Sequence, residues 1–398
     1  EPVPAHPTDR AYLPDSVRSV ATEVDGPSEK DRPDDRTREF HRRASIGSMK
    51  VVHTSRHLGH DPEVEFESAS LHPAFEHVGR AEAIREVLAT DAAFTLTEPI
   101  RWGTGPIEAV HDPALVRFLG SAWSEFQQVR PGTREVVPDV FMHRGLRAGM
   151  GEIDEPSAIE ARLGWWTYEV TTPLTEGTFD AALGAVDTAL SATAIVLDGE
   201  RVAYGLCRPP GHHAGSALYG GYCFLNNAAI AAHHVSSTTG ARVTVLDVDY
   251  HHGNGTQQIF YGRDDVQYVS LHADPARAYP FVTGFAEEIG TGRGRGTTMN
   301  LPLPAGTTDE VYLRSLEAAC EAISAFSPSV LIVSLGLDTF VDDPIADLAL
   351  TAEGFERCGE LVGRLDLPTV VLQEGGYDVA SLGDNVRRWL HGIARAGA

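Results

Sequence analysis

Polar residues that suit a hydrolytic metal site follow four separate hydrophobic runs of this 398-residue chain. The runs are mostly apolar and rich in Val, Ile and Leu, without regular polar alternation, which is typical of buried strands in a parallel sheet. Open α/β sheets place their ligands beyond the carboxyl ends of such strands, so we expect the four polar groups to converge. They are His212-His213 after residues 202–207, Asp247 to His251 after 243–246, Asp338 after 330–333, and Glu374 to Tyr377 after 369–372.

Three of these residues match the ligands of a hydrolytic zinc ion. Asp247, Asp249 and His251 are spaced two apart, so on an extended strand their side chains leave the same face. A catalytic zinc keeps three protein ligands and an open position for water, and Asp249, His251 and the distant Asp338 supply them. His212-His213 would then stand beside that water as proton-transfer groups. Taken singly, each motif could equally be a polar strand exit, but buried acids without a counter-cation favour a metal.

The longer motifs around these residues resemble those of the histone-deacetylase-like amidohydrolases, and within them the acetylpolyamine amidohydrolase branch. The resemblance runs in order from about Met49 to the C-terminus and implies a three-layer α/β/α fold with a central, mostly parallel sheet, as in arginase and the deacetylases. The matching segments are Arg208-Pro-Pro-Gly-His-His-Ala214, Gly220-Gly-Tyr-Cys-Phe-Leu-Asn-Asn227, Leu246-Asp-Val-Asp-Tyr-His-His-Gly-Asn-Gly-Thr256, Ser334-Leu-Gly-Leu-Asp338 and Glu374-Gly-Gly-Tyr377, with Ser270-Leu-His-Ala-Asp-Pro275 and residues 284–298 typical of the branch.

The resemblance implies roles for the polar residues. It pairs His212 with Asp247 and His213 with Asn254, and it makes Tyr377 the donor to the oxyanion. A carboxylate partner favours an imidazolium and a neutral amide does not, so we expect His213 to be the base. The metal is expected to be Zn2+, with Fe2+ or Co2+ as alternatives, because two carboxylates and an imidazole suit several divalent ions.

Further binding residues follow from the same resemblance. It implies a structural K+ held by Asp247, Asp249, His251, Ser270 and Leu271. Tyr222, beside Gly221, and Tyr279 match two aromatic rings that clasp the acyl-amine stem. Glu160 matches one of two entrance glutamates that recognise a distant ammonium, whereas the other position is Thr171. Glu169 could compensate only if that segment is extended, so we expect weak preference for cationic amides.

The chain is expected to hold one catalytic domain, residues 49–398, after a Pro- and charge-rich extension, residues 1–48. Residues 132–166 form a long stretch punctuated by Pro and Gly, and such stretches are usually functional or disordered. In the family that it resembles, this stretch narrows the entrance of the active site and forms a homodimer interface. Trp165-Trp166, Met142 and Met150 could serve such an interface here. Alternatively, the tryptophans are core residues of a following helix.

Composition narrows the classes of partner and compartment. The net charge of −24 argues against nucleic acid and is compatible with a cationic substrate. The four cysteines show no Cys-X-X-Cys spacing, which indicates buried thiols of a reducing compartment. No segment looks long and apolar enough to span a membrane or to form a signal peptide. We therefore expect a cytoplasmic enzyme.

These observations predict a metal-dependent hydrolase that removes acetyl or related acyl groups from small N-acetylated amines, above all acetylpolyamines. Three alternatives remain open: an acetyl-lysine protein deacetylase, an inactive acyl-amine binder, and a ureohydrolase with two manganese ions. The ureohydrolase requires additional bridging carboxylates, but Asn254 and Thr339-Phe340 occupy the neighbouring positions. An inactive binder would be expected to lack Tyr377 or a ligand.

Overall fold

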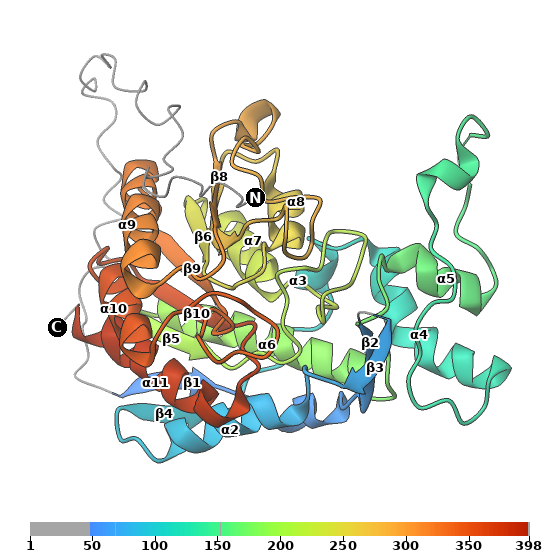
Figure 1. Cartoon of the computed structure of the whole chain (residues 1–398), viewed down its shortest axis with the longest axis horizontal. Coiled ribbons are helices and arrows are strands. Elements are labelled where there is room, and N and C mark those ends of the chain that lie inside the picture. Colours follow the sequence, from blue (N-terminus) through green and yellow to red (C-terminus); the bar gives the residue numbers. More distant parts are fainter. Residues whose placement is uncertain (1–47, 68, 152, 397–398) are drawn as a thin grey trace, which may run out of the picture. The chain divides into compact units, whose positions relative to one another are not determined.

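The computed structural model describes residues 48–67, 69–151 and 153–396, so the predicted extension of residues 1–48 lies outside it except for Ser48. An eight-stranded sheet forms the centre of the domain (Figure 1), and all its paired strands are parallel. The strand order is β4-β1-β5-β10-β9-β6-β7-β8. The strands are β1 (Met49–Val52), β4 (Phe94–Thr97), β5 (Val202–Gly205), β6 (Val243–Asp247), β7 (Val266–Ala273), β8 (Thr298–Leu303), β9 (Val330–Leu335) and β10 (Thr369–Gln373). A separate antiparallel pair is formed by β2 (Val64–Glu67) and β3 (Ser70–Pro73).

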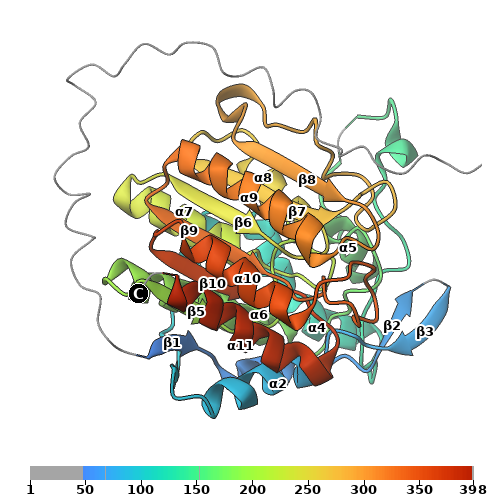
Figure 2. The same cartoon turned by 60° about the vertical axis from the view of Figure 1, so that its left-hand side comes forward.

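Helices cover both faces of this sheet, because successive strand residues point to opposite sides and both sets are apolar. On one face Leu331 and Val333 pack with α2, α9, α10 and α11. On the other face Val330 and Ile332 pack with α6, α7 and α8. Figure 2 shows α9, α10 and α11 side by side over the first face. The predicted three-layer α/β/α fold is therefore confirmed.

The helices differ in length and position. The helices of the two layers are α2 (Val78–Ala89), α6 (Thr178–Leu197), α7 (Asn227–Thr239), α8 (Asn254–Phe260), α9 (Asp309–Phe326), α10 (Ala352–Gly363) and α11 (Val379–Arg395). Further helices are α3 (Gly105–Glu108), α4 (Pro113–Val129) and α5 (Ile159–Trp166), and the short 3-10 helices are η2 (Ser55–Gly59), η3 (Arg144–Arg147) and η4 (Gly292–Gly294).

Helix α6 corrects one expectation from the sequence. Its 20 residues have a mean hydropathy of 1.4, so by length and composition this helix could cross a membrane. In the fold, 72% of the apolar stretch of this helix is buried. Its residues Ala185, Ala189 and Ala192 pack in the core beside β5 and β10. The apolar composition of α6 is that of a central core helix.

Candidate metal-dependent active site

The four predicted strands lie next to one another in the sheet. Strands β5, β10, β9 and β6 are consecutive neighbours, and their parallel registers bring their carboxyl ends to one edge. The polar groups that follow them therefore meet, although as many as 165 residues, from His212 to Tyr377, separate them along the chain. This convergence is what the sequence predicts.

The three expected metal ligands form a tight cluster at this edge. One potential ligand atom from each of Asp249, His251 and Asp338 lies within 4.8 Å of the other two. His251 Nδ1 lies 3.1 Å from Asp338 Oδ2 and 3.3 Å from Asp249 Oδ1. The backbone fixes both carboxylates, because Tyr250 N donates to Asp338 Oδ1 at 2.9 Å and Gly375 N donates to Asp249 Oδ2 at 2.8 Å.

The charges of this cluster fit a bound cation. Asp249 and Asp338 are buried, and within the part of the chain that the structure describes their ion-pair partners are histidines only. Burial raises the pKa of Asp338 to about 6, with the charge of Asp249 adding to the effect. A divalent ion would neutralise these acids. A Cβ at Gly375 would lie 2.5 Å from Asp338 Oδ2 and 2.6 Å from Asp249 Oδ2, so glycine is required for this close approach.

The two adjacent histidines have the partners that the resemblance implies. His212 Nδ1 lies 3.1 Å from Asp247 Oδ2, and His213 Nδ1 lies 2.7 Å from Asn254 Oδ1. Burial by itself would lower the pKa of His212, but Asp249 and Asp247 outweigh it and raise that pKa well above its ordinary value. Burial and the neighbouring imidazoles hold the pKa of His213 well below its ordinary value.

Tyr377 is the third polar side chain of the site, beside His213 and His251. Its side chain is buried, and burial raises the pKa of its hydroxyl, which therefore stays protonated. The Arg80 guanidinium lies 4.6 Å from the centre of the Tyr377 ring. Arg80 also donates to the backbone carbonyls of Glu374 and Gly376 at 2.7 and 2.6 Å, so it holds the loop on which Tyr377 stands.

A pocket of about 500 Å3 opens over these groups. His213, His251 and Tyr377 reach into it, and the two predicted aromatic residues, Tyr222 and Tyr279, form part of its wall. Its lining residues are Phe141, Glu169, Val170, Thr171, His213, Gly221, Tyr222, Tyr250, His251, Arg277, Ala278, Tyr279, Phe281, Ile345 and Tyr377.

Gly221 is placed at the pocket by backbone geometry. Its φ is +58°, and a Cβ there would lie 2.4 Å from Cδ2 of His213. Any side chain would therefore displace the histidine that we expect to be the base, and a left-handed φ favours glycine in addition. Gly221 N donates to Glu169 Oε1 at 3.1 Å.

The predicted entrance glutamate is not brought to the pocket. Glu160 is absent from the lining of the pocket, and its carboxylate lies 3.9 Å from the guanidinium of Arg130 at the surface. In its place Glu169 lines the pocket, on a non-helical segment that follows α5. Thr171 and Thr172 donate hydrogen bonds to the Glu169 carboxylate and fix its position.

The residues assigned to potassium lie on two neighbouring strands. Asp247 of β6 is in register with Ser270 of β7, and Asp247, Ser270 and Leu271 are all fully buried. Tyr268 donates to Asp247 Oδ2 at 3.0 Å.

Two further residues shape the site, and sequence reasoning assigned a role to neither of them. The Glu374 carboxylate accepts from Gly211 N at 2.6 Å and from His212 N at 3.2 Å, so it holds the histidine loop. Tyr168 accepts a hydrogen bond from Tyr279 at 2.7 Å, and the two rings stack 6.5 Å apart. The position of Glu374 directly after a buried strand could have indicated a structural role at the site, whereas no sequence pattern pointed to Tyr168.

The predicted entrance stretch, residues 132–166, contributes to the pocket through Phe141. Trp166 is 4% exposed and donates to Glu155 at 2.8 Å, so it is a core residue and not part of an exposed interface. Leu146 and Met150, by contrast, are 63% and 67% exposed. In Figures 1 and 2 the segment around η3 projects from the rest of the domain.

Residues 72–393 match the histone deacetylase domain family, so this chain belongs to that family, and the predicted resemblance is confirmed. Acetylpolyamine amidohydrolase 1 of Pseudomonas aeruginosa is 39% identical over 348 residues, which cover 87% of this chain and 99% of that relative. The enzyme of the same name from Mycoplana ramosa is 38% identical over 347 residues, 87% of this chain and 100% of the relative.

The fold is also similar to that of a solved structure with the same kind of name. The crystal structure of acetylpolyamine aminohydrolase from Burkholderia pseudomallei has a TM-score of 0.82 at 38% identity, covering 88% of this chain and 99% of that one. The family implies a divalent metal ion, and membership in it decides against the ureohydrolase alternative.

Proposed function

We propose that this chain hydrolyses the amide bond of small N-acetylated amines with the help of a divalent metal ion. One observation carries the proposal. The Asp249, His251 and Asp338 cluster lies beside His213 and Tyr377 at a pocket of about 500 Å3. That set would supply the metal site, the base and the oxyanion donor that amide hydrolysis requires.

We propose Zn2+ for this site, with Fe2+ or Co2+ as alternatives, because these ions accept carboxylate and imidazole ligands. When bound by the cluster, the ion would polarise the substrate carbonyl and lower the pKa of a water molecule. The backbone hydrogen bonds to both carboxylates keep the ligand oxygens in place before the ion binds.

The proton transfers fall to His213. Its lowered pKa favours the neutral imidazole near pH 7, so Nε2 can accept a proton from the attacking water and deliver it to the leaving amine. His212, whose pKa is raised, stays an imidazolium and stabilises negative charge in the transition state. Tyr377 donates from its hydroxyl to the oxyanion.

The substrate class is inferred from the pocket wall. The rings of Tyr222 and Tyr279 offer flat surfaces to an alkyl stem, and their faces tolerate a passing ammonium. Glu169 adds a carboxylate to the wall, and the net charge of −24 favours cations. Acetylated diamines and polyamines combine these features, and the relatives are named for acetylpolyamines.

Three further assignments belong to this proposal. A structural K+ would be held by Asp247, Ser270 and the backbone of Asp249, His251 and Leu271, where it would orient the metal ligands. The exposed apolar residues around η3 would form a homodimer interface. The enzyme would act in the cytoplasm, because all four cysteines are free and buried.

The test is acetate release from three acetamides: N-acetyl-1,4-diaminobutane, N-butylacetamide and an acetyl-lysine peptide. With Zn2+ bound, the cationic amide is expected to be hydrolysed fastest. Dialysis against a chelator should abolish the reaction, and Zn2+ should restore it. No acetate release from any of the three would refute the proposal, and a preference for the peptide would reassign the chain to protein deacetylation.

A further inference from the structure

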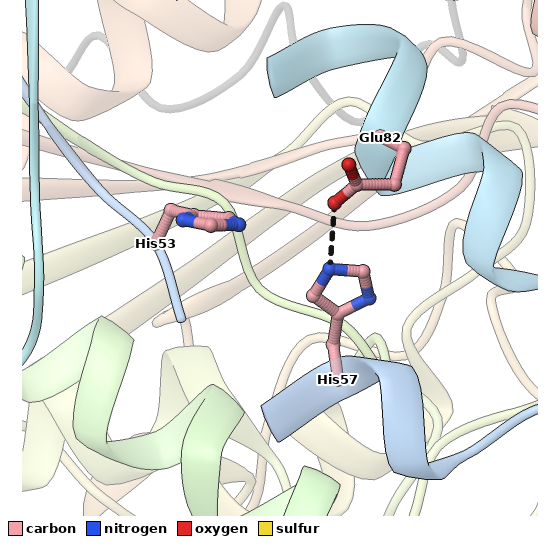
Figure 3. Close-up of side chains that lie close together, drawn as sticks. All are labelled: His53, His57 and Glu82. Atoms are coloured by element: carbon pink, nitrogen blue, oxygen red, sulfur yellow. Dashed lines mark hydrogen bonds and ion pairs between the residues drawn. The ribbon is translucent and has the colours of Figure 1, made fainter. Parts of the chain in front are cut away.

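A second cluster of metal-ligating side chains lies where β1, η2 and α2 meet (Figure 3). His53 directly follows β1, His57 lies on η2, and Glu82 lies on α2. One potential ligand atom from each lies within 4.8 Å of the other two. None of the three lines the pocket that contains His213 and Tyr377, so this cluster is separate from the proposed active site.

The contact between His57 and Glu82 has a separation that suits two ligands of one ion. His57 Nε2 lies 3.1 Å from Glu82 Oε1, and metal–ligand bonds of about 2.0–2.1 Å in a tetrahedral site place ligand atoms about 3.3 Å apart. Figure 3 shows the outer end of the His53 ring directed toward the space beside this pair. The rings of His53 and His57 are 5.8 Å apart and inclined at 63°, so they do not stack.

The cluster contains a buried ring nitrogen that needs a partner. Within the described part of the chain, no group forms a hydrogen bond with His53 Nε2, although this atom is buried. A buried polar atom without a partner destabilises a fold by about 1–3 kcal/mol, and an ion is one of the ordinary explanations. An ion held by His53, His57 and Glu82 would give His53 Nε2 the partner that it lacks.

The charge state of the cluster suits a cation. Burial lowers the pKa of both imidazoles, so they are neutral near pH 7, and neutral imidazole is the form that binds metals. The hydrogen bond from Arg85 lowers the pKa of Glu82, which stays ionised. Arg85 uses Oε2 of this carboxylate, and Oε1 faces His57. The Glu82 side chain is 30% exposed, which gives an ion a path from solvent.

We propose that His53, His57 and Glu82 bind a divalent transition-metal ion of the Zn2+ type. Two imidazoles and one carboxylate are ligands that Zn2+, Co2+ and Ni2+ accept, whereas Mg2+ and Ca2+ prefer oxygen ligands throughout. The ion would fasten η2 to α2. Arg208, which begins the loop carrying the catalytic histidines, donates to the backbone carbonyl of His57 at 2.8 Å, so the site would also steady the anchor of that loop.

The test counts metal ions bound by the full chain. Protein freed of metal by a chelator is titrated with Zn2+ in competition with a chromogenic chelator. Glu82→Gln and His53→Asn should each bind one ion fewer per chain than the wild type. The matched control is Glu86→Gln, because Glu86 lies on the same helix, 3.8 Å from Arg85, and is 72% exposed but outside the cluster. It should bind as many ions as the wild type.

Equal stoichiometry in the wild type, Glu82→Gln and His53→Asn would overturn the proposal. A second background separates this site from the proposed active site. Asp249→Ala removes a ligand of the other cluster only, so it should still bind one Zn2+, and that ion should be lost when Glu82→Gln is added. An Asp249→Ala protein that folds, by circular dichroism, and binds no Zn2+ would also refute the site.

Discussion

At the scale of single residues, the two adjacent histidines differ because their surroundings differ. Asp249 and Asp247 outweigh burial and raise the pKa of His212, whereas burial and the neighbouring imidazoles lower the pKa of His213. The carboxylate of Asp247 faces His212, whereas the neutral amide of Asn254 faces His213. The two rings lie 4.0 Å apart, and their pKa values are shifted in opposite directions, which favours the imidazolium at His212 and the neutral imidazole at His213. Charge on His212 further disfavours a proton on His213, which is the arrangement that a base beside a cation requires.

Asn254→Asp tests this division directly. A carboxylate on His213 Nδ1 would raise the pKa of His213 by about 1–3 units. Because His213 must be neutral to accept a proton, the acidic limb of the kcat/KM profile should move to higher pH by a similar amount. The pH profile of acetate release measures this shift, and an unmoved acidic limb would remove His213 from the role of base.

Tyr377→Phe tests the oxyanion donor. Loss of such a donor lowers kcat by about 100- to 1000-fold in other hydrolases, and we expect a similar loss here with little change in bound metal or in KM. Steady-state kinetics and elemental analysis of the same preparation check both parts. A variant with nearly full kcat would assign the oxyanion to another donor.

Glu169→Gln tests recognition of the substrate cation. A partly exposed carboxylate contributes about 0.5–1 kcal/mol to such a contact, so KM for N-acetyl-1,4-diaminobutane should rise by about two- to fivefold, with less change for neutral N-butylacetamide. Glu160→Gln is the matched control and should change neither, because Glu160 lies outside the pocket. If Glu160→Gln instead raised KM for N-acetyl-1,4-diaminobutane, Glu160 would be the carboxylate that recognises the cation, and it would reach the pocket only in the proposed homodimer.

At the scale of elements, the segment around η3 exposes apolar side chains that a partner could cover. Leu146 and Met150 are more than half exposed, while Phe141 of the same segment lines the pocket. A second copy packed against η3 would bury the apolar side chains and fix the position of Phe141.

The double variant Leu146→Ser, Met150→Ser should therefore be monomeric and should show an altered KM. Light scattering at several protein concentrations measures its mass. Leu58→Ser is a suitable control, because Leu58 is also an exposed apolar residue, at 49%, but lies on η2 and not in the segment around η3. This variant should keep the mass of the wild type. A wild-type protein that is monomeric at all concentrations would contradict the interface.

At the scale of the whole molecule, the described domain begins with β1, which pairs with both β4 and β5. The proposed active-site ligands and catalytic residues lie between His212 and Tyr377, and the second proposed metal site begins only at His53. Removal of residues 1–47 should therefore leave metal binding and kcat unchanged. Expression of the truncated chain, followed by the same acetate assay, tests this; an insoluble or inactive product would make the extension part of the fold.

Much of the site could be predicted from the sequence, because strand-end chemistry is local. The apolar runs before His212, Asp247, Asp338 and Glu374 predict buried parallel strands, and parallel strands end at one edge of a sheet. Residue types and spacing were enough to predict that Asp249, His251 and Asp338 would lie together, and in the fold they do.

Only the tertiary structure decided the features that depend on packing between distant segments. An ungapped count placed Glu160 at the entrance, but the turn after α5 brings Glu169 to the pocket and leaves Glu160 beside Arg130. Helix α6 has the composition of a membrane span, yet it packs in the core against β1, β5 and β10. Glu82 lies 25 residues after His57 in the sequence, and it meets His53 and His57 only because β1, η2 and α2 pack together. Such contacts depend on how loops and helices cross, and local residue patterns do not encode this.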